Sequence, residues 1–220
     1  MSIRADKRLA AIGDCVEGRC VADIGCDHGK LACGLVAEGR AERAIATDIS
    51  AACLVKAREL ASATGVADRV ETRVGDGLAV IGDGEADCVV IAGMGGDLIA
   101  NIMLSAAREG KKFSRFVLSP NTHAERVREA VCAVGQRIEK DFCVECAGKR
   151  YAVIATAAGE ERLDGLQTLF GKFFRTDAEF ARYADRELAS LEAALGENPA
   201  ATALAERKLA LERARKECMA

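Results

Sequence analysis

The 220-residue sequence lacks any run of about 18 apolar residues, the length that a membrane-spanning helix needs. Its N-terminus, Met-Ser-Ile-Arg-Ala-Asp-Lys-Arg, lacks the apolar stretch of a signal peptide. We therefore expect a soluble cytoplasmic protein without a membrane partner. The chain also lacks an excess of positive charge, because its formal net charge is −3. A local basic stripe would still suffice to contact phosphates, and ordinary solvated surface is the alternative.

Histidine is scarce, and the sequence holds only His28 and His123. Among ten cysteines, Cys143 and Cys146 form a C-x-x-C pair. No second C-x-x-C and no H-x-x-x-H completes a zinc site, so we expect no metal. The pair closes a strand-like run, whereas a redox C-x-x-C opens a helix. The other cysteines are expected to be reduced and to pack as small hydrophobes.

Apolar strand-like runs alternate with helical segments between about residues 20 and 120. The runs cover residues 20–25, 44–49, 70–74, 88–94 and 116–119. They predict an α/β fold with a parallel sheet covered on both faces, whose strands end at one ligand-binding edge. Two further runs, 137–145 and 151–156, are separated by a short turn and must pair antiparallel. A parallel sheet with such a C-terminal antiparallel hairpin is typical of class I methyltransferases, which have a Rossmann-like sheet.

From about residue 159 the composition becomes charged and rich in alanine. We expect two parts, an α/β domain over residues 1–159 and a helical hairpin of coiled-coil type over residues 160–220. Gly196 is the predicted helix stop, and Asn198-Pro199 the predicted start of the second helix. The phenylalanines are expected to form a core rather than to stack on bases. The predicted apolar seam comprises Leu163, Leu166, Phe170, Phe173, Phe180, Leu188, Leu191 and Leu195.

The first strand runs into the turn Asp23-Ile24-Gly25-Cys26-Asp27-His28-Gly29, which departs from the dinucleotide pattern G-x-G-x-x-G. Asp27 stands where a middle glycine is usual. Its carboxylate would repel a pyrophosphate but suits S-adenosylmethionine, which carries a sulfonium and an ammonium group. A plain strand-to-helix turn is the alternative. S-adenosylmethionine is a methyl donor, and the residues of this turn predicted to bind it are Asp23, Gly25, Cys26, His28 and Gly29.

Two further acids follow the next two strands. Asp48 can accept hydrogen bonds from both ribose hydroxyls, a role that nicotinamide enzymes share. Asp76 stands where methyltransferases meet the adenine amino group. Each acid is also an ordinary turn or N-cap residue. Acids after three successive strands nevertheless predict a cofactor across the sheet edge, with Ile49 and Gly77 beside it.

The fourth strand ends in Ile-Ala-Gly-Met-Gly-Gly, so backbone rather than side chains would line this part of the pocket. We assign Ala92, Gly93 and Met94 to the donor site, with a simple turn as the alternative. After the fifth strand, Asn121 can bond a target base or cap the next helix. Tyr151 can stack on base or donor, or belong to the core.

Four of these stretches together resemble the bacterial tRNA (adenine-22 N1) methyltransferase family. They are A-D-I-G-C-D-H at 22–28, I-A-G-M-G-G-D-L-I at 91–99, L-S-P-N at 118–121 and G-K-R-Y-A-V-I at 148–154. The resemblance covers about residues 1–160, and the helical hairpin is similar to the family's C-terminal appendage. Cys26, Ser119 and Gly29-Lys30 depart from the family, which more often has Ser, Gln and an aromatic residue there. These departures affect the shape of the pocket more than the reaction class.

The resemblance implies methyl transfer from S-adenosylmethionine to N1 of adenine 22 in the D-arm region of tRNA. N1 is nucleophilic without a strong base, so the enzyme must align it, exclude water and receive an unpaired or flipped base. Methylation leaves the adenine cationic, and Asp27 is the predicted catalytic carboxylate. Binding the donor's ammonium group or capping the next helix is the alternative for Asp27. The residues predicted to contact the tRNA substrate are Lys7, Arg8, Pro120, Asn121 and Tyr151.

Two other functions are alternatives to methylation of tRNA. The same fold could methylate another RNA or a small molecule, or the chain could be a non-catalytic RNA-binding protein with a decayed donor site. The intact Asp23, Asp48 and Asp76 count against the decayed site. The oligomeric state is left open by the sequence.

Overall fold

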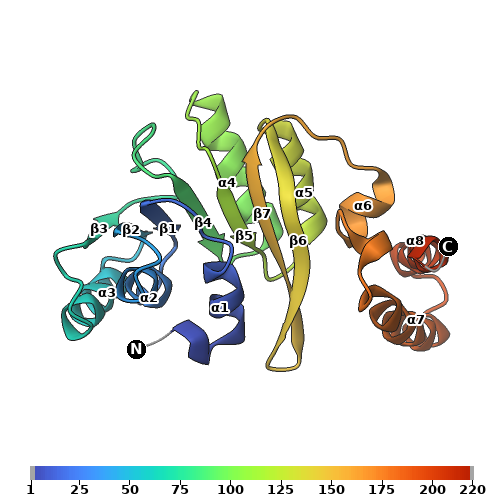
Figure 1. Cartoon of the computed structure of the whole chain (residues 1–220). Helices are drawn as coiled ribbons and strands as arrows, with labels where there is room; N and C mark the ends of the chain where they lie inside the picture. Colours follow the sequence, from blue (N-terminus) through green and yellow to red (C-terminus); the bar gives the residue numbers. More distant parts are fainter. Residues whose placement is uncertain (1–2, 219–220) are drawn as a thin grey trace. The chain divides into compact units, whose positions relative to one another are not determined.

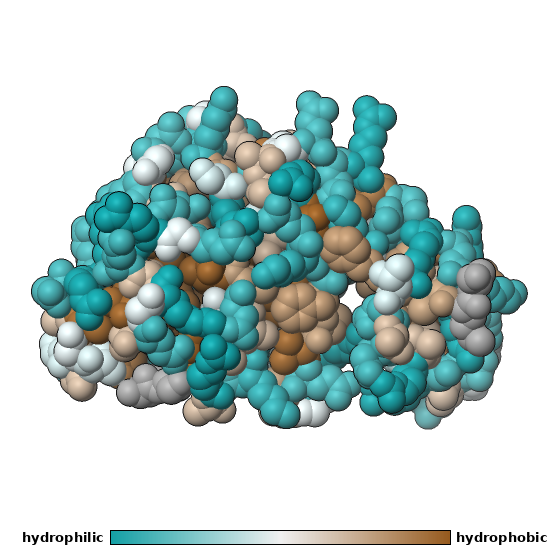
Figure 2. All heavy atoms as spheres, in the orientation of Figure 1, coloured by the Kyte–Doolittle hydropathy of each residue, from teal (hydrophilic) through white to brown (hydrophobic). Residues whose placement is uncertain are grey.

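The computed structural model describes residues 3–218, which form two compact units. The first unit ends at Arg162 and the second begins at Leu163 (Figure 1). No helix among the described residues has the length and apolar character needed to cross a membrane. Hydrophilic side chains cover most of the face shown in Figure 2, with smaller apolar patches between them.

The first unit is built on a seven-stranded sheet. Its strands are β1 (Cys20–Ile24), β2 (Arg43–Asp48), β3 (Val70–Val74), β4 (Cys88–Ala92), β5 (Phe116–Ser119), β6 (Gln136–Cys146) and β7 (Lys149–Ala158). Their order across the sheet is β3-β2-β1-β4-β5-β7-β6. The first five are parallel, whereas β7 is antiparallel to both β5 and β6. The predicted parallel sheet with a terminal antiparallel hairpin is confirmed.

Helices cover both faces of this sheet (Figure 1). They are η1 (Ile3–Ala5), α1 (Lys7–Gly13), α2 (Lys30–Ala37), α3 (Ala51–Ala63), α4 (Gly96–Arg108) and α5 (Ala124–Ala133). Ile12, Leu35 and Leu54 of α1, α2 and α3 belong to one buried cluster with the strands, while α4 and α5 pack together on the other face. Every residue of β1 and β5 is buried, which explains why these strands are apolar apart from Asp23 and Ser119.

The element boundaries differ slightly from those predicted. The strand predicted over residues 88–94 ends at Ala92, because Gly93 takes a φ of +82° that an extended strand does not allow. The following helix begins at Gly96. The turn between β4 and α4 therefore consists of Gly93, Met94 and Gly95, which lie at the sheet edge.

A buried ion pair joins α5 to β6. Nε of Arg128 donates to Oδ2 of Asp141 at 2.8 Å, and Nη2 donates to Oδ1 at 3.0 Å. The two side chains are only 3% and 1% exposed. A bidentate pair of this kind has strong, directional hydrogen bonds, and removal of one partner leaves an uncompensated buried charge. The pair therefore fixes the outer strand of the hairpin to the helix that precedes it.

The second unit is helical and has its own core. It contains α6 (Gly165–Phe170), η2 (Phe174–Thr176), α7 (Phe180–Glu197) and α8 (Thr202–Cys218). Helices α7 and α8 pack against each other as the predicted hairpin. Phe174, Phe180 and Leu211 are buried in this core, and Phe170 meets Phe180 edge-on at 5.8 Å between ring centroids. The phenylalanines of the core thus pack against one another.

Two details predicted for this unit are wrong. The apolar seam does not follow one helix, because Gly171 ends α6 with a φ of +113° and a 3-10 turn precedes α7. As a result Phe173 is 39% exposed, whereas Phe174 is buried instead. The second helix does not begin at Asn198-Pro199. The backbone N–H of Asn198 bonds to Ala194 and so closes α7, and α8 starts only at Thr202.

Candidate active site

Three acids lie where neighbouring parallel strands end. Asp23 is the fourth of the five residues of β1, Asp48 is the last residue of β2, and Asp76 lies two residues beyond β3. Because β3, β2 and β1 are adjacent and parallel, the acids line one edge of the sheet. Asp23 is buried, Asp48 is half-buried and Asp76 is exposed. Gly77, beside Asp76, has a φ of +52° and faces Ile102 of α4.

Burial dominates the chemistry of Asp23. Its side chain accepts a hydrogen bond from the backbone N–H of Ala32 at 3.2 Å, and the residue is 4% exposed. Removal from water raises the pKa of the Asp23 carboxyl to about 7, and the nearby charge of Asp48 acts in the same direction. The hydrogen bond from Ala32 opposes this rise. A cation brought to this edge would therefore meet a carboxyl group that is poised to ionise.

The turn after β1 is closely packed against two other elements. Gly25 has a φ of +68°, and a Cβ there would lie 2.0 Å from Cε of Met94. Gly29 has a φ of +70° and precedes α2, where a Cβ would lie 2.8 Å from Cβ of Ala57. Cys26 is buried between them, and burial raises the pKa of its thiol well above the ordinary value. The glycine turn after β1 thus touches the glycine turn after β4.

Asp48 ties the end of β2 to this turn. Its Oδ2 accepts from the backbone N–H of Asp27 at 3.1 Å, and its Oδ1 accepts from the backbone N–H of Ser50 at 2.8 Å. Each carboxylate oxygen retains further acceptor capacity. Ile49 is 75% exposed and Val74 is 57% exposed, so apolar surface lies at the ends of the same two strands. A carboxylate flanked by exposed apolar side chains is suited to a sugar and a base.

Asp27 adopts a φ of +51° and keeps its side chain 71% exposed. Its Oδ1 lies 3.6 Å from Sγ of Cys53 and 3.5 Å from Nε2 of His28. These three residues offer ligand atoms within 4.8 Å of one another, a mixture that a transition metal accepts. The ammonium group of Lys56, however, lies 3.2 Å from the same Nε2 and disfavours a cation there. The sequence pattern contained no signal for Cys53 or Lys56.

Arg8 connects α1 to the residues after β5. Its Nε donates to Oγ of Ser119 at 3.0 Å, its Nη2 to the Ser119 carbonyl at 2.5 Å, and its Nη1 to Oδ1 of Asn121 at 2.8 Å. The guanidinium lies over the ring of Tyr151, with Cζ 4.0 Å from the ring centroid. Burial lowers the pKa of Arg8, although the group stays charged at neutral pH. Three predicted substrate residues, Arg8, Asn121 and Tyr151, are therefore brought together.

Asn121 extends this network to the turn after β4. Its Nδ2 donates to the carbonyl of Gly93 at 2.6 Å, and its backbone N–H donates to the carbonyl of Met94 at 2.7 Å. The backbone N–H of Gly93 bonds in turn to the Ser119 carbonyl at 3.1 Å. Ser119 was not predicted as a site residue, although its place at the end of β5 is visible in the sequence.

The remaining predicted residues have simpler environments. Ala92 ends β4 and is half-buried, Pro120 is buried next to Asn121, and Lys7 is exposed at the start of α1. His123 lies at the start of α5, where its Nδ1 is 2.5 Å from Oδ2 of Asp97. This hydrogen bond raises the pKa of His123 and lowers that of Asp97.

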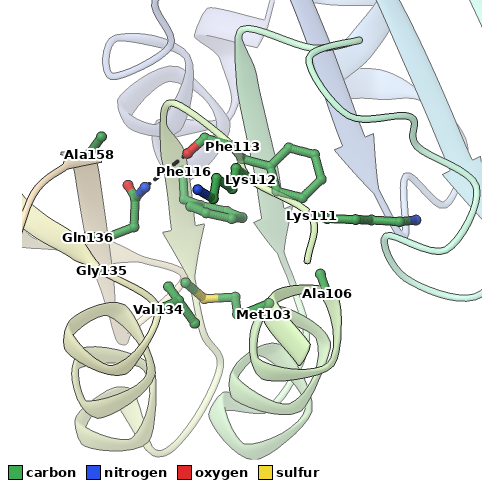
Figure 3. Close-up of a pocket in the computed structure, with 11 residues that line it drawn as sticks. Met103, Ala106, Lys111, Lys112, Phe113, Phe116, Val134, Gly135, Gln136 and Ala158 are labelled. Carbon is green, nitrogen blue, oxygen red and sulfur yellow. Dashed lines mark hydrogen bonds between the residues drawn. The ribbon is translucent and has the colours of Figure 1, made fainter. Parts of the chain in front are cut away.

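A separate cavity of about 310 Å³ opens at the opposite edge of the sheet, near the first residue of β5 (Figure 3). Met103 and Val134 face the rings of Phe113 and Phe116 there. Nε2 of Gln136 donates to the Phe113 carbonyl at 2.9 Å. None of the predicted site residues lines this cavity, so it is distinct from the candidate active site.

Comparison with known proteins places this arrangement in a family. The family described as methyltransferase domain matches residues 5–154. A Bacillus subtilis tRNA (adenine(22)-N(1))-methyltransferase is 35% identical over 159 residues, which are 72% of this chain and 67% of that protein. The solved structure of the B. subtilis M1A22 tRNA methyltransferase TrmK has a TM-score of 0.83 and 30% identity, covering 96% of this chain and 98% of that one.

A Streptococcus pneumoniae protein, described as a candidate tRNA (m1A22) methyltransferase and solved with S-adenosyl-L-methionine, has a TM-score of 0.84 and 28% identity. The alignment covers 95% of this chain and 98% of that chain. The two solved structures thus match this chain over almost its whole length. The chain belongs to the tRNA (adenine(22)-N(1))-methyltransferase family.

Proposed function

We propose that this protein transfers a methyl group from S-adenosylmethionine to N1 of adenine 22 in tRNA, in the cytoplasm. The main observation behind the proposal is that Asp23, Asp48 and Asp76 lie at the ends of β1, β2 and β3, on the same edge of the sheet as the Arg8–Asn121 network at the end of β5. The acids suit the donor, and the network offers a polar surface for a base. The B. subtilis and S. pneumoniae relatives support both the reaction and the donor.

The residues present fit S-adenosylmethionine. When bound, this group supplies a methyl on a positively charged sulfur. The Asp48 carboxylate, with its spare acceptor capacity, would hold the ribose hydroxyls, and exposed Ile49 and Asp76 would flank the adenine. Asp23 and the positive-φ turn at Gly25 would lie under the methionine part, where the buried carboxyl favours a cation. Cys26, His28, Gly29, Gly77 and Ala92 would complete the walls of this site.

Target adenine N1 uses its in-plane lone pair to take the methyl group, so no residue has to remove a proton first. The protein's task is to hold N1 in line with the methyl group and to keep water out. We assign the amide of Asn121, the ring of Tyr151 and the backbone at Gly93 and Met94 to this task. Because N1 is on the pairing edge, the adenine must leave its helix to reach them.

Asp27 is our proposed catalytic carboxylate. The adenine gains a positive charge as N1 is methylated, and a nearby carboxylate stabilises that charge or accepts the N6 proton. The Asp27 side chain is exposed, and its backbone is fixed by the bond from its N–H to Asp48. Asp27 thus holds an exposed carboxylate, with Oδ1 near Cys53 and His28, where it can face an incoming base. Binding of the donor's ammonium group is the competing role.

We also propose that residues 160–220 and the exposed Lys7 contact the tRNA away from the target base. Helix α8 carries basic residues in its last turn, Arg215 and Lys216. Arg215 is paired with Asp185 of α7, so a phosphate would have to compete with that carboxylate. Photochemical cross-linking of bound tRNA, followed by peptide mapping, is expected to label α7 or α8. Labels confined to residues before 160 would contradict this role.

The direct test combines purified protein, labelled S-adenosylmethionine and two tRNA transcripts that differ only by adenine or guanine at position 22. We expect N1-methyladenosine in the first transcript and no methyl transfer to the second. Methylation of a different nucleoside, or of neither RNA, would overturn the proposed substrate. Transfer that continues without RNA would indicate a small-molecule substrate instead.

The role of Asp27 is tested by Asp27→Asn, with Asp68→Asn as the matched control because Asp68 is an exposed acid before β3. A catalytic carboxylate predicts a fall in kcat of about 100-fold or more, with donor affinity retained. The control is expected to keep the wild-type rate. Loss of donor affinity at an unchanged kcat would instead assign Asp27 to the ammonium group.

A further inference from the structure

We propose that Arg8 is a positioning residue for methyl transfer. In this proposal its guanidinium fixes the Asn121 amide and, through it, the turn after β4 that receives the target adenine. The inference rests on the proposed function. It gives Arg8 a role different from the RNA contact that its basic character suggests.

The geometry of the guanidinium supports this role. Its three nitrogens donate to three different acceptors, two on Ser119 and one on Asn121, and its flat face rests on Tyr151. A planar fork can satisfy acceptors in fixed directions, which a lysine ammonium cannot reproduce. The group is also partly withdrawn from water, where charged hydrogen bonds are stronger. Arg8 is therefore committed to the protein rather than to a phosphate.

Arg8 also determines which way the Asn121 amide points. An asparagine amide can be turned by 180° with little change of shape, but its oxygen only accepts and its nitrogen only donates. Arg8 has only donors, and the Gly93 carbonyl has only acceptor positions. Oδ1 must therefore face Arg8 at 2.8 Å and Nδ2 must face Gly93 at 2.6 Å. Without Arg8, one of these two constraints is lost.

The consequence extends from Asn121 to the donor turn. The backbone of Asn121 bonds to Met94, and the Met94 side chain packs directly on Gly25. The oriented amide keeps one free N–H and one acceptor position, the pair with which asparagine recognises adenine. Arg8 thus connects helix α1 to both sides of the reaction, the base and the donor turn.

The test compares Arg8→Lys with Arg19→Lys, which makes the same substitution at an exposed arginine paired with Glu42 at the amino end of β1. For Arg8→Lys we expect kcat to fall about 10- to 100-fold, the range given by loss of charged hydrogen bonds. KM for tRNA and the affinity for S-adenosylmethionine are expected to stay within about twofold of wild type. The Arg19 variant is expected to match the wild type in all three quantities.

A phosphate contact predicts the opposite pattern. KM for tRNA would then rise for Arg8→Ala with kcat unchanged, and lysine would restore it because it keeps the charge. That result would overturn the positioning role.

A second measurement does not depend on tRNA. In nitrogen-15 NMR spectra, Arg8→Lys is expected to shift the side-chain amide of Asn121 and the backbone amides of Gly93 and Met94, whereas Arg19→Lys is not. Unchanged signals at these three sites would refute the proposal even if the wild-type protein methylates tRNA. Shifted signals in a wild-type protein inactive on tRNA would retain the network and refute the proposed function instead.

Discussion

Donor affinity is expected to depend on pH through Asp23. The carboxyl of Asp23 is buried beside the donor turn, and burial raises its pKa from the ordinary 3.8 to about 7. Because the folded-state pKa is raised, Asp23 favours the folded state most below pH 3.8. This advantage is lost as the pH rises through 7. Because the pKa of Asp23 is about 7, its carboxyl is largely protonated in the unliganded protein in mildly acidic buffer.

The ammonium group of S-adenosylmethionine favours the ionised carboxylate, so binding below pH 7 should expel the Asp23 proton. Affinity then falls about tenfold for each pH unit below 7, or about 100-fold between pH 7 and pH 5. An α-amino group with an ordinary pKa near 7.7 stays protonated throughout that window, so its own titration adds little. Above pH 7 the dependence on Asp23 disappears.

Titration calorimetry at pH 5, 6, 7 and 7.5, in buffers of different ionisation enthalpy, measures both affinity and proton release. We expect about one proton released per donor bound at pH 5 to 6 and little at pH 7.5. Asp23→Asn, which has the same shape but no titration, should bind weakly and without this pH dependence. Constant wild-type affinity from pH 5 to 7 with no proton release would refute the reasoning.

Two further predictions concern stability and packing. Arg128→Met should lower the free energy of unfolding by about 3–5 kcal/mol, because it leaves Asp141 buried without its partner. Adding Asp141→Leu should recover much of the loss in denaturant titrations, and no recovery would contradict the ion-pair explanation. Gly96→Ala should cost about 1–3 kcal/mol, because the new Cβ would lie 2.1 Å from the backbone oxygen of His123. Gly165→Ala, where the new Cβ meets open space, should be nearly neutral in the same denaturant titrations.

The sheet and its acidic edge could be predicted because their signals are local. Buried parallel strands such as β1 are mostly apolar, and Asp23, Asp48 and Asp76 lie at or just after the ends of strands in the sequence itself. The hairpin was predictable for the same reason, since a short turn leaves only antiparallel pairing. Local sequence patterns were therefore sufficient to predict the family and the fold.

The contacts that organise the site could not be predicted in this way. Arg8 meets Ser119 and Asn121 across 111 and 113 positions of the chain. The contact of Met94 with Gly25 likewise arises only when β4 pairs with β1. The seam in the second unit was mispredicted because the spacing of apolar residues continues through Gly171, whereas the backbone does not. Residue spacing records which faces are apolar but not where a helix is interrupted.

The position of β7 between β5 and β6 has a consequence for how the protein is made. On the ribosome β6 emerges before β7, yet it has no hydrogen-bonding partner until β7 is complete at Ala158. Until then β5 presents an unpaired edge, the kind of surface on which growing chains associate with one another. The last strand of the sheet to be translated, β7, is thus the one that joins β6 to β5. A nascent chain stalled before Lys149 should depend on chaperones in a way that a chain released after Ala158 does not.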